Sequence, residues 1–148
     1  MSGNPPSKDN EYCAAHHKPY SALAADLAGN TVASYVFITP NMCNDMHDDC
    51  EGGRVRQGDD WLQSELPPMM EWAQSNDGVI FLAWDEGKET QNLPFLAIGA
   101  QVKKGFAGAQ TYDHRSIIKS VEKIFGLPVL EAVKDSNDLG DLFEDGLE

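Results

Sequence analysis

Residues 79–84, Val-Ile-Phe-Leu-Ala-Trp, form a continuous apolar run that stops abruptly at Asp85 and Glu86. Such a run of β-branched and aromatic residues favours a strand that is covered on both faces. Similar runs at 32–39, which a proline ends, and at 95–99 predict two further strands. Two-faced apolar strands are typical of a mainly parallel sheet flanked by helices, so we expect an α/β fold.

Three segments between and after these strands are expected to be helical. Residues 19–30 begin with a proline and end at Gly-Asn, 61–74 follow two aspartates that can cap a helix, and 116–125 are amphipathic. The pair Pro67 and Pro68 predicts a break or a kink in the second of these helices.

The chain is long enough for one domain, at 148 residues, and its ordinary apolar content excludes wholesale disorder. We expect a polar arm over residues 1–18, an α/β domain over 19–130 and an acidic tail over 131–148 that is only partly ordered. Within the domain, residues 41–58 are rich in Asn, Asp and Gly and predict a long polar loop.

The chain is strongly acidic, with 24 Asp and Glu against 11 Lys and Arg and a formal net charge of -13. Like charges repel, so neither nucleic acid nor an anionic membrane is expected as the main partner. An acidic chain that acts on an anionic substrate needs a cation to mediate the contact. The sequence holds no apolar run long enough for a membrane span, and its polar start lacks the apolar core of a signal peptide.

Cys43 and Cys50 enclose a short polar segment, and Cys13 stands alone upstream. Two interpretations are open: three free thiols in a cytosolic protein, or a Cys43–Cys50 disulfide that stiffens the enclosed loop. A zinc site is disfavoured, because no second Cys pair or closely spaced His pair supplies the usual ligands.

Polar side chains gather where two of the predicted strands end. Asp85 and Glu86 follow the second strand directly, and the first is followed by Asn41, Asn44, Asp45, His47 and Asp48. Ligand sites of open α/β sheets lie outside the carboxyl ends of the strands, so we expect both groups in one cleft. Gathered carboxylates would repel one another without a divalent cation, and this donor set suits Mg²⁺, Mn²⁺ or Ca²⁺, with Zn²⁺ a further candidate.

Each group taken alone also fits a solvated loop or a turn, and His114 alone fits a helix start. The coincidence of both acidic groups with strand ends, and of His114 with the start of a helix, favours a functional site.

Four segments, in this order, resemble the bacterial and fungal phosphoesterases that include acid phosphatases and phospholipases C, with an alkaline-phosphatase-like core. Residues 37–48 resemble the "PN-x-x-ND-x-HD" loop of that family, and residues 58–68 resemble its "GD-x-WL … P" helix. Residues 81–87 resemble its "F-x-x-[FW]DEG" strand end, and residues 98–127 resemble its "YTHYS … FGL" ending.

The resemblance implies a metal-assisted hydrolase of phosphate esters, with a phosphorylated small molecule as substrate and a phosphomonoester favoured over a diester. It implies that Asp85 and Glu86 are metal ligands and that His47 and His114 contact the phosphoryl group or transfer protons. The resemblance also implies a substrate-binding role for Asn44, Asp45 and Asp48. The two aspartates would act by orienting His47 or by contacting the metal. The family is typically exported, which agrees with a Cys43–Cys50 bridge.

The chain departs from the family pattern because it resembles only the second half of that pattern. Family members are usually much longer, and their first half carries a Glu-Asn metal-binding motif and a Ser or Thr nucleophile, neither of which we find. Metal-activated water is therefore the expected nucleophile; Ser116 is not, because it opens a helix that buries apolar residues.

Two alternatives to this enzyme stay open. A non-catalytic domain could bind a metal, a phosphate or a partner chain, whereas a carboxylic-ester hydrolase is disfavoured because the chain has no Gly-x-Ser-x-Gly elbow. Whatever the function, both faces of the predicted strands need to be covered by apolar side chains, and the few predicted helices cannot cover both faces. We therefore expect a homo-oligomer, most simply a two-fold dimer.

Overall fold

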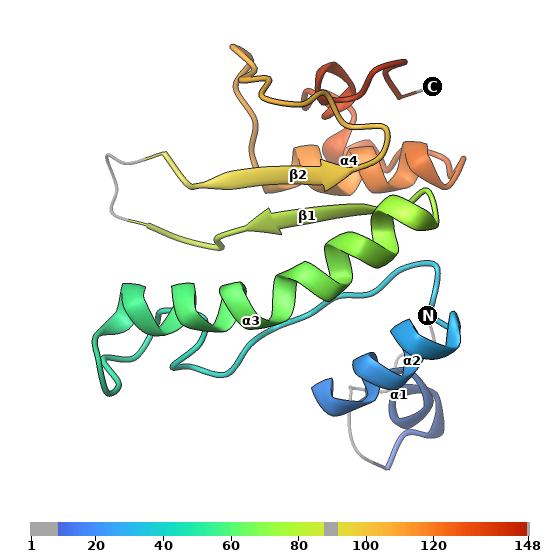
Figure 1. Ribbon diagram of the computed structural model, residues 1–148. Helices are drawn as coiled ribbons and strands as arrows, with labels where there is room; N and C mark the ends of the chain where they lie inside the picture. The colour runs from blue at the N-terminus through green and yellow to red at the C-terminus, as the bar shows by residue number, and fades with distance from the viewer. Residues whose placement is uncertain (1–8, 88–91, 148) are drawn as a thin grey trace. The chain divides into compact units, whose positions relative to one another are not determined.

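A computed structural model describes residues 9–87 and 92–147 of the chain. The chain divides into two compact units, Met1–Met69 and Met70–Glu148, and the elements of each are followed by colour in Figure 1. Residues 1–8 of the predicted polar arm lie outside the described part. No helix among the described residues is both long and apolar enough to cross a membrane.

The first unit opens with two short helices. Helix α1, Glu11–His16, starts after Asn10, whose side chain accepts a hydrogen bond from the amide of Cys13 (3.2 Å). The turn η1, Tyr20–Ala22, leads into α2, Leu23–Gly29, which confirms the helix predicted over 19–30. Asn30 ends α2 in the left-handed conformation with φ 52°, a role for which Asn is suited after Gly.

The strand predicted over residues 32–39 is absent. This segment has no regular secondary structure, and the side chains of Tyr35, Val36 and Phe37 are all exposed. A strand needs a neighbour to satisfy its backbone N–H and C=O groups, and the described residues of this unit contain no strand that could pair with it. The prediction of a strand over residues 32–39 was therefore wrong.

Helix α3, Arg54–Ser75, starts earlier than the predicted Trp61, so the polar loop is shorter than residues 41–58. Pro67 and Pro68 both lie inside this helix, and the helical assignment continues through them without the predicted break. Both prolines are exposed. Water can therefore reach the two carbonyl groups that lose their N–H partners.

The second unit contains a β-hairpin in place of the expected mainly parallel sheet. Strand β1, Val79–Ala83, pairs antiparallel with β2, Phe95–Gly99, in a register that sets Val79 opposite Gly99 and Ala83 opposite Phe95. Both strands were predicted, but their parallel arrangement was wrong for the described residues. The connection over residues 84–94 is too short for the crossover helix that a parallel pair requires.

The core of the second unit is completed by the C-terminal segment. Val102, Leu139 and Phe143 are buried together, and Phe81 and Ile117 pack against them. Leu139 and Phe143 belong to the segment that was expected to be a partly ordered tail. It contains η2, Glu131–Val133, and η3, Gly140–Leu142, and Phe143 forms a bridge with Val102. The apolar side chains of this segment thus pack on the hairpin although acids surround them in the sequence.

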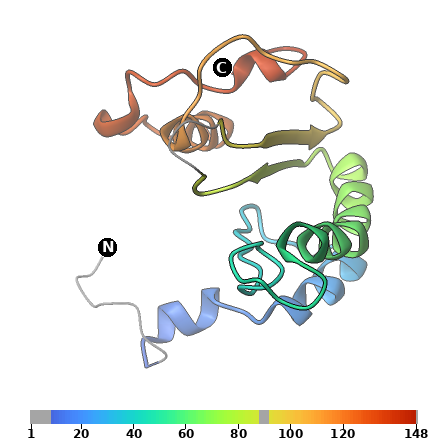
Figure 2. The same cartoon turned by 90° about the vertical axis from the view of Figure 1, so that its left-hand side faces the viewer.

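Helix α4, His114–Ile124, lies beside the hairpin in both Figure 1 and Figure 2 and anchors the C-terminal segment through polar side chains. Lys123 Nζ lies 3.0 Å from Asp138 Oδ2, and the amide of Leu139 donates to Ser120 Oγ (2.8 Å). Burial raises the pKa of Asp138, but hydrogen bonds from the Gly140 amide and from Lys123 hold the pKa below its usual value. These contacts fix α4 and the segment after it as one packed layer.

Candidate functional site

The loop after Pro40 is held in shape by its own side chains. Asn41 Oδ1 accepts hydrogen bonds from the amides of Cys43 (3.2 Å) and Asn44 (3.0 Å). A disulfide joins Cys43 to Cys50, which decides between the two interpretations of the cysteines. The segment that carries Asn44, Asp45, His47 and Asp48 is therefore a covalently closed loop.

Within this loop, His47 is oriented by both neighbouring aspartates. Its amide donates to Asp45 Oδ1 (2.9 Å), and its Nδ1 lies 2.9 Å from Asp48 Oδ1. Because an ionised carboxylate only accepts hydrogen bonds, Nδ1 carries the proton and Nε2 is left to contact a ligand. The hydrogen bond to Asp48 raises the pKa of His47, and the negative charges of Asp48 and Asp45 act in the same direction.

The loop also packs on the first turns of α3, at Gly58. A Cβ atom at this position would lie 2.4 Å from Cε and 2.5 Å from Cγ of Met46, and 3.2 Å from the backbone oxygen of Asn44. Met46 itself has a positive φ of 72°. Because Gly58 has no side chain, Met46, the residue before His47, can pack against the helix. Sequence reasoning missed this role: Gly58 was placed at the end of the predicted polar loop, although it is the first position of the "GD-x-WL" motif.

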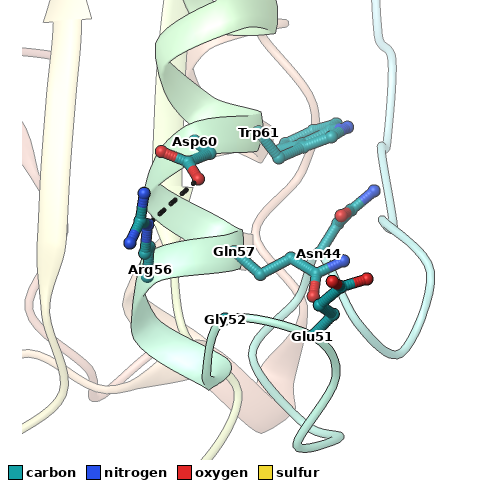
Figure 3. Close-up of a pocket in the computed structure, with 7 residues that line it drawn as sticks. All are labelled: Asn44, Glu51, Gly52, Arg56, Gln57, Asp60 and Trp61. Atoms are coloured by element: carbon teal, nitrogen blue, oxygen red, sulfur yellow. Dashed lines mark ion pairs between the residues drawn. The ribbon is translucent and has the colours of Figure 1, made fainter.

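A pocket of about 470 Å³ opens between this loop and α3 (Figure 3). Its lining belongs entirely to the first unit and includes Asn44, one of the predicted substrate-binding residues. The other lining residues are Glu51, Gly52, Arg56, Gln57, Asp60 and Trp61. None of these six was proposed from the sequence as a site residue, because each fits an ordinary loop or helix surface.

The second group of predicted residues lies at the end of β1. Asp85 and Glu86 follow the strand after Trp84, and both are exposed. The Glu86 amide donates to Asp85 Oδ1 (2.9 Å), which orients that carboxylate. His114 Nε2 lies 3.3 Å from the backbone oxygen of Trp84, so the imidazole lies against the segment that carries both acids. A carbonyl oxygen only accepts, so Nε2 carries the proton there and Nδ1 is free to face a ligand.

His114 is the first residue of α4 because Asp113 caps that helix. The Asp113 carboxylate accepts from the Ser116 amide (3.2 Å), and the Asp113 amide donates to Ser116 Oγ (3.1 Å), which completes a capping box. A hydrogen bond from Arg115 lowers the pKa of Asp113, as do its bonds to the Ser116 and Arg115 amides. Arg115 Nη2 lies 2.5 Å from Asp113 Oδ2, so the two side chains form an ion pair.

The predicted residues thus form two groups, one in each unit. Asn44, Asp45, His47 and Asp48 share the closed loop of the first unit. In the second unit, Asp85 and Glu86 follow β1, and His114 contacts the backbone of Trp84, the residue before them.

The carboxylates of Asp85 and Glu86 are hard oxygen donors of the kind that Mg²⁺ or Ca²⁺ prefers. Across residues 9–87 and 92–147, however, no three or more His, Cys, Asp or Glu side chains gather in a way that could hold a metal ion. Within this part of the chain, the two acids do not form a complete metal site.

A model of the phosphoesterase family matches residues 3–128. The chain belongs to the phosphoesterase family, as the motifs in its sequence indicated.

Similar proteins include a phosphatidylinositol-3-phosphatase of Mycobacterium tuberculosis, which is 30% identical over 129 residues, 86% of this chain and 42% of the relative. An acid phosphatase of Aspergillus fumigatus is 31% identical over 120 residues, 76% of this chain and 26% of the relative. A phosphate-repressible acid phosphatase of Penicillium chrysogenum is 31% identical over 121 residues, with 28% of its length covered. The chain spans less than half the length of these relatives. No solved structure matches it.

Proposed function

We propose that the chain acts on phosphate esters as a phosphatase. The observation that carries this proposal is the contact between His114 Nε2 and the backbone oxygen of Trp84 (3.3 Å). It sets an imidazole beside the acidic pair Asp85 and Glu86, on a helix start whose backbone N–H groups favour negative charge. Membership of the phosphoesterase family and the names of the relatives support the same reaction.

His114 would contact the phosphoryl group through Nδ1, since its other ring nitrogen is engaged by Trp84. In the first unit, His47 offers Nε2 to a phosphate, because Asp48 holds Nδ1. The raised pKa of His47 favours the cationic form, which attracts a phosphate and can donate a proton to a departing oxygen. Asp45 and Asp48 orient His47, and Asn44 offers an amide to substrate.

We further propose that Asp85 and Glu86 supply two of the ligands of a divalent cation, Mg²⁺, Mn²⁺, Ca²⁺ or Zn²⁺. Such a cation, when bound, neutralises charge on the phosphoryl oxygens and lowers the pKa of a bound water. Support comes from the two adjacent carboxylates and from the net charge of -13, which would otherwise repel an anionic substrate.

The finer fold proposal is that residues 19–130 form part of an alkaline-phosphatase-like α/β domain. The match of the family model to residues 3–128 and the partial coverage of longer relatives support this proposal. The unpaired segment 32–39 is also consistent with it, because its sequence favours a strand that has no neighbour here.

Phosphomonoesters of small molecules are the proposed substrates, ahead of phosphodiesters. The relatives are named acid phosphatases and a phosphatidylinositol-3-phosphatase, and these names describe monoester hydrolysis. The test is hydrolysis of p-nitrophenyl phosphate, and of bis(p-nitrophenyl) phosphate as the diester, with EDTA or with each of the four cations added. We expect metal-dependent release of p-nitrophenol from the monoester; no release with any cation would refute the enzyme proposal.

A second candidate is a non-catalytic domain that binds a metal, phosphate or a partner chain. It is favoured by one observation: Tyr35, Val36 and Phe37 are exposed in a segment without regular secondary structure, and such an apolar surface suits a partner chain. Binding of Mn²⁺ or inorganic phosphate by calorimetry, without hydrolysis in the assay above, would support this candidate.

A further inference from the structure

The pocket of Figure 3 has a composition unlike that of a phosphate site. Its lining carries two carboxylates, those of Glu51 and Asp60, against a single guanidinium, that of Arg56. Arg56 Nε lies 3.7 Å from Asp60 Oδ2, and this ion pair leaves Glu51 as uncompensated negative charge. A net negative charge in the lining disfavours a phosphoryl group relative to a neutral group that forms hydrogen bonds.

Gln57 provides a second, independent indication of a ligand. Its side-chain oxygen is buried and, within the described part of the chain, is the one buried side-chain polar atom without a hydrogen-bond partner. Figure 3 shows Gln57 extending from α3 toward Asn44 and Glu51. A buried acceptor without a partner costs free energy, so a ligand that donates a hydrogen bond to this oxygen would be favoured.

Trp61 supplies the flat apolar wall of the same pocket. Tyr20 supports the indole: the two ring centroids are 5.6 Å apart, and the Tyr20 hydroxyl donates to Glu65 Oε2 (2.8 Å). An aromatic face beside amide and carboxylate groups matches a polyol, whose C–H surface packs on the ring. Its hydroxyl groups can both donate to and accept from the polar side chains.

From this charge, this unpaired acceptor and this aromatic wall, we infer that the pocket binds the alcohol portion of the phosphate ester, as a compact polyhydroxylated group. The inference rests on the proposed function, because the alcohol is the leaving group of the ester. Asn44 connects the pocket with His47, which is proposed to contact phosphate. It lines the pocket and lies three residues before His47 in the disulfide-closed loop.

The test is a titration of the isotope-labelled full chain with myo-inositol, followed by NMR. We expect saturable shifts of the Gln57 side-chain amide and of the Trp61 indole N–H. Gln57→Leu should weaken binding by about fivefold, the effect of losing one neutral hydrogen bond. Gln63→Leu, at an exposed position of the same helix, should bind as the unchanged chain does.

Two further probes make the result specific. Inorganic phosphate should leave the Gln57 and Trp61 signals in place, and ethanolamine should bind more weakly than myo-inositol. Equal or tighter binding of ethanolamine would overturn the inference, since an ammonium site would then be present. Saturable shifts of the same two signals by phosphate would overturn it as well.

Hydrolysis of p-nitrophenyl phosphate on the same samples separates the two proposals. If myo-inositol binds but no ester is hydrolysed, the proposed function fails and the pocket remains a polyol site. If the ester is hydrolysed but myo-inositol moves neither the Gln57 nor the Trp61 signal, the phosphatase proposal stands and this inference is overturned.

Discussion

The imidazole of His114 and the backbone of Trp84 meet at 3.3 Å, which joins the first residue of α4 to the segment just after β1. These residues are thirty positions apart in the sequence, and their contact sets His114 against the residue that precedes Asp85 and Glu86. The relationship depends on the capping box at Asp113, which starts α4 at His114 and not a turn later.

His114→Ala is expected to lower turnover of p-nitrophenyl phosphate by roughly 10²–10⁴-fold, because a group that transfers a proton or stabilises charge is lost. The side chain is exposed, so thermal unfolding should change little. His17→Ala, an exposed histidine of the first unit, is the matched control and should keep full turnover. Equal activity of the two variants would remove His114 from the reaction.

A second prediction concerns the pKa of His47, which the hydrogen bond to Asp48 raises above the ordinary 6.5. Because the folded-state pKa is raised, the His47–Asp48 interaction stabilises the loop fully below the unfolded pKa and loses this effect as pH rises through the folded pKa. Asp48→Asn should move the pKa of His47 down toward 6.5 in an NMR titration. Asp49→Asn, the neighbouring exposed acid, should move it less; equal shifts would show that no specific pair exists.

The same pair gives a pH dependence of activity. If His47 acts as a cation, turnover should persist to higher pH than an ordinary histidine permits, and Asp48→Asn should move the alkaline limb of the profile to lower pH. An unchanged alkaline limb would assign that limb to another group.

Local patterns predicted the local structure well. The apolar runs at 79–84 and 95–99 correspond to β1 and β2, and the proline-to-glycine segment at 19–30 corresponds to η1 and α2. His114 was expected at the start of a helix, and the structure confirms that α4 begins there. Turn chemistry and helix capping act over a few residues, so a single sequence contains their signals.

Non-local features were not predictable in the same way. The sequence of 32–39 favours a strand, but strand formation depends on a pairing partner elsewhere, and the antiparallel sense of β1 and β2 depends on the length of their connection. Leu139 and Phe143 lie in an acidic segment, whose charge led to the prediction of a partly ordered tail. The sequence therefore did not indicate that these two side chains belong to the core. At the candidate site, the loop and strand-end residues were identified from motifs, whereas Gln57 carried no signal of its own.

A third prediction concerns the proposed cation. Asp85→Asn and Glu86→Gln should each abolish stimulation by added Mn²⁺ or Mg²⁺ and weaken Mn²⁺ binding measured by calorimetry, because each removes a charged oxygen donor. Both side chains are exposed, so the unfolding transition should stay in place. Glu71→Gln, an exposed acid of α3, is the matched control. Unchanged Mn²⁺ binding in both variants would place the cation elsewhere.

A fourth prediction concerns Gly58, where two effects oppose each other. Alanine is preferred over glycine in a helix by about 1 kcal/mol, but forcing a methyl group into a packed contact costs about 1–3 kcal/mol. With Met46 Cγ at 2.5 Å from the added atom and a backbone oxygen at 3.2 Å, we expect the clash to exceed the preference. Gly58→Ala should therefore lower the midpoint of urea unfolding and lower turnover with it.

The double variant Gly58→Ala, Met46→Ala is the control for that clash. Removing the Met46 side chain opens the space, so the double variant should recover part of the stability that Gly58→Ala loses. If Gly58→Ala stabilises the chain, or if Met46→Ala gives no recovery, the loop is not held against α3 at this point.

The last prediction concerns self-association, and it follows from apolar side chains in the segment 32–39. Tyr35, Val36 and Phe37 are 56%, 44% and 79% exposed, and three consecutive exposed apolar residues on unpaired backbone favour association with another chain. At micromolar concentration we expect sedimentation to detect a dimer, and Phe37→Ser should shift it toward monomer. Val55→Ser, which alters an isolated exposed side chain of α3, should leave the dimer unchanged. A 16.2 kDa species at every concentration, with no binding of a hydrophobic dye, would show that this segment needs no partner chain.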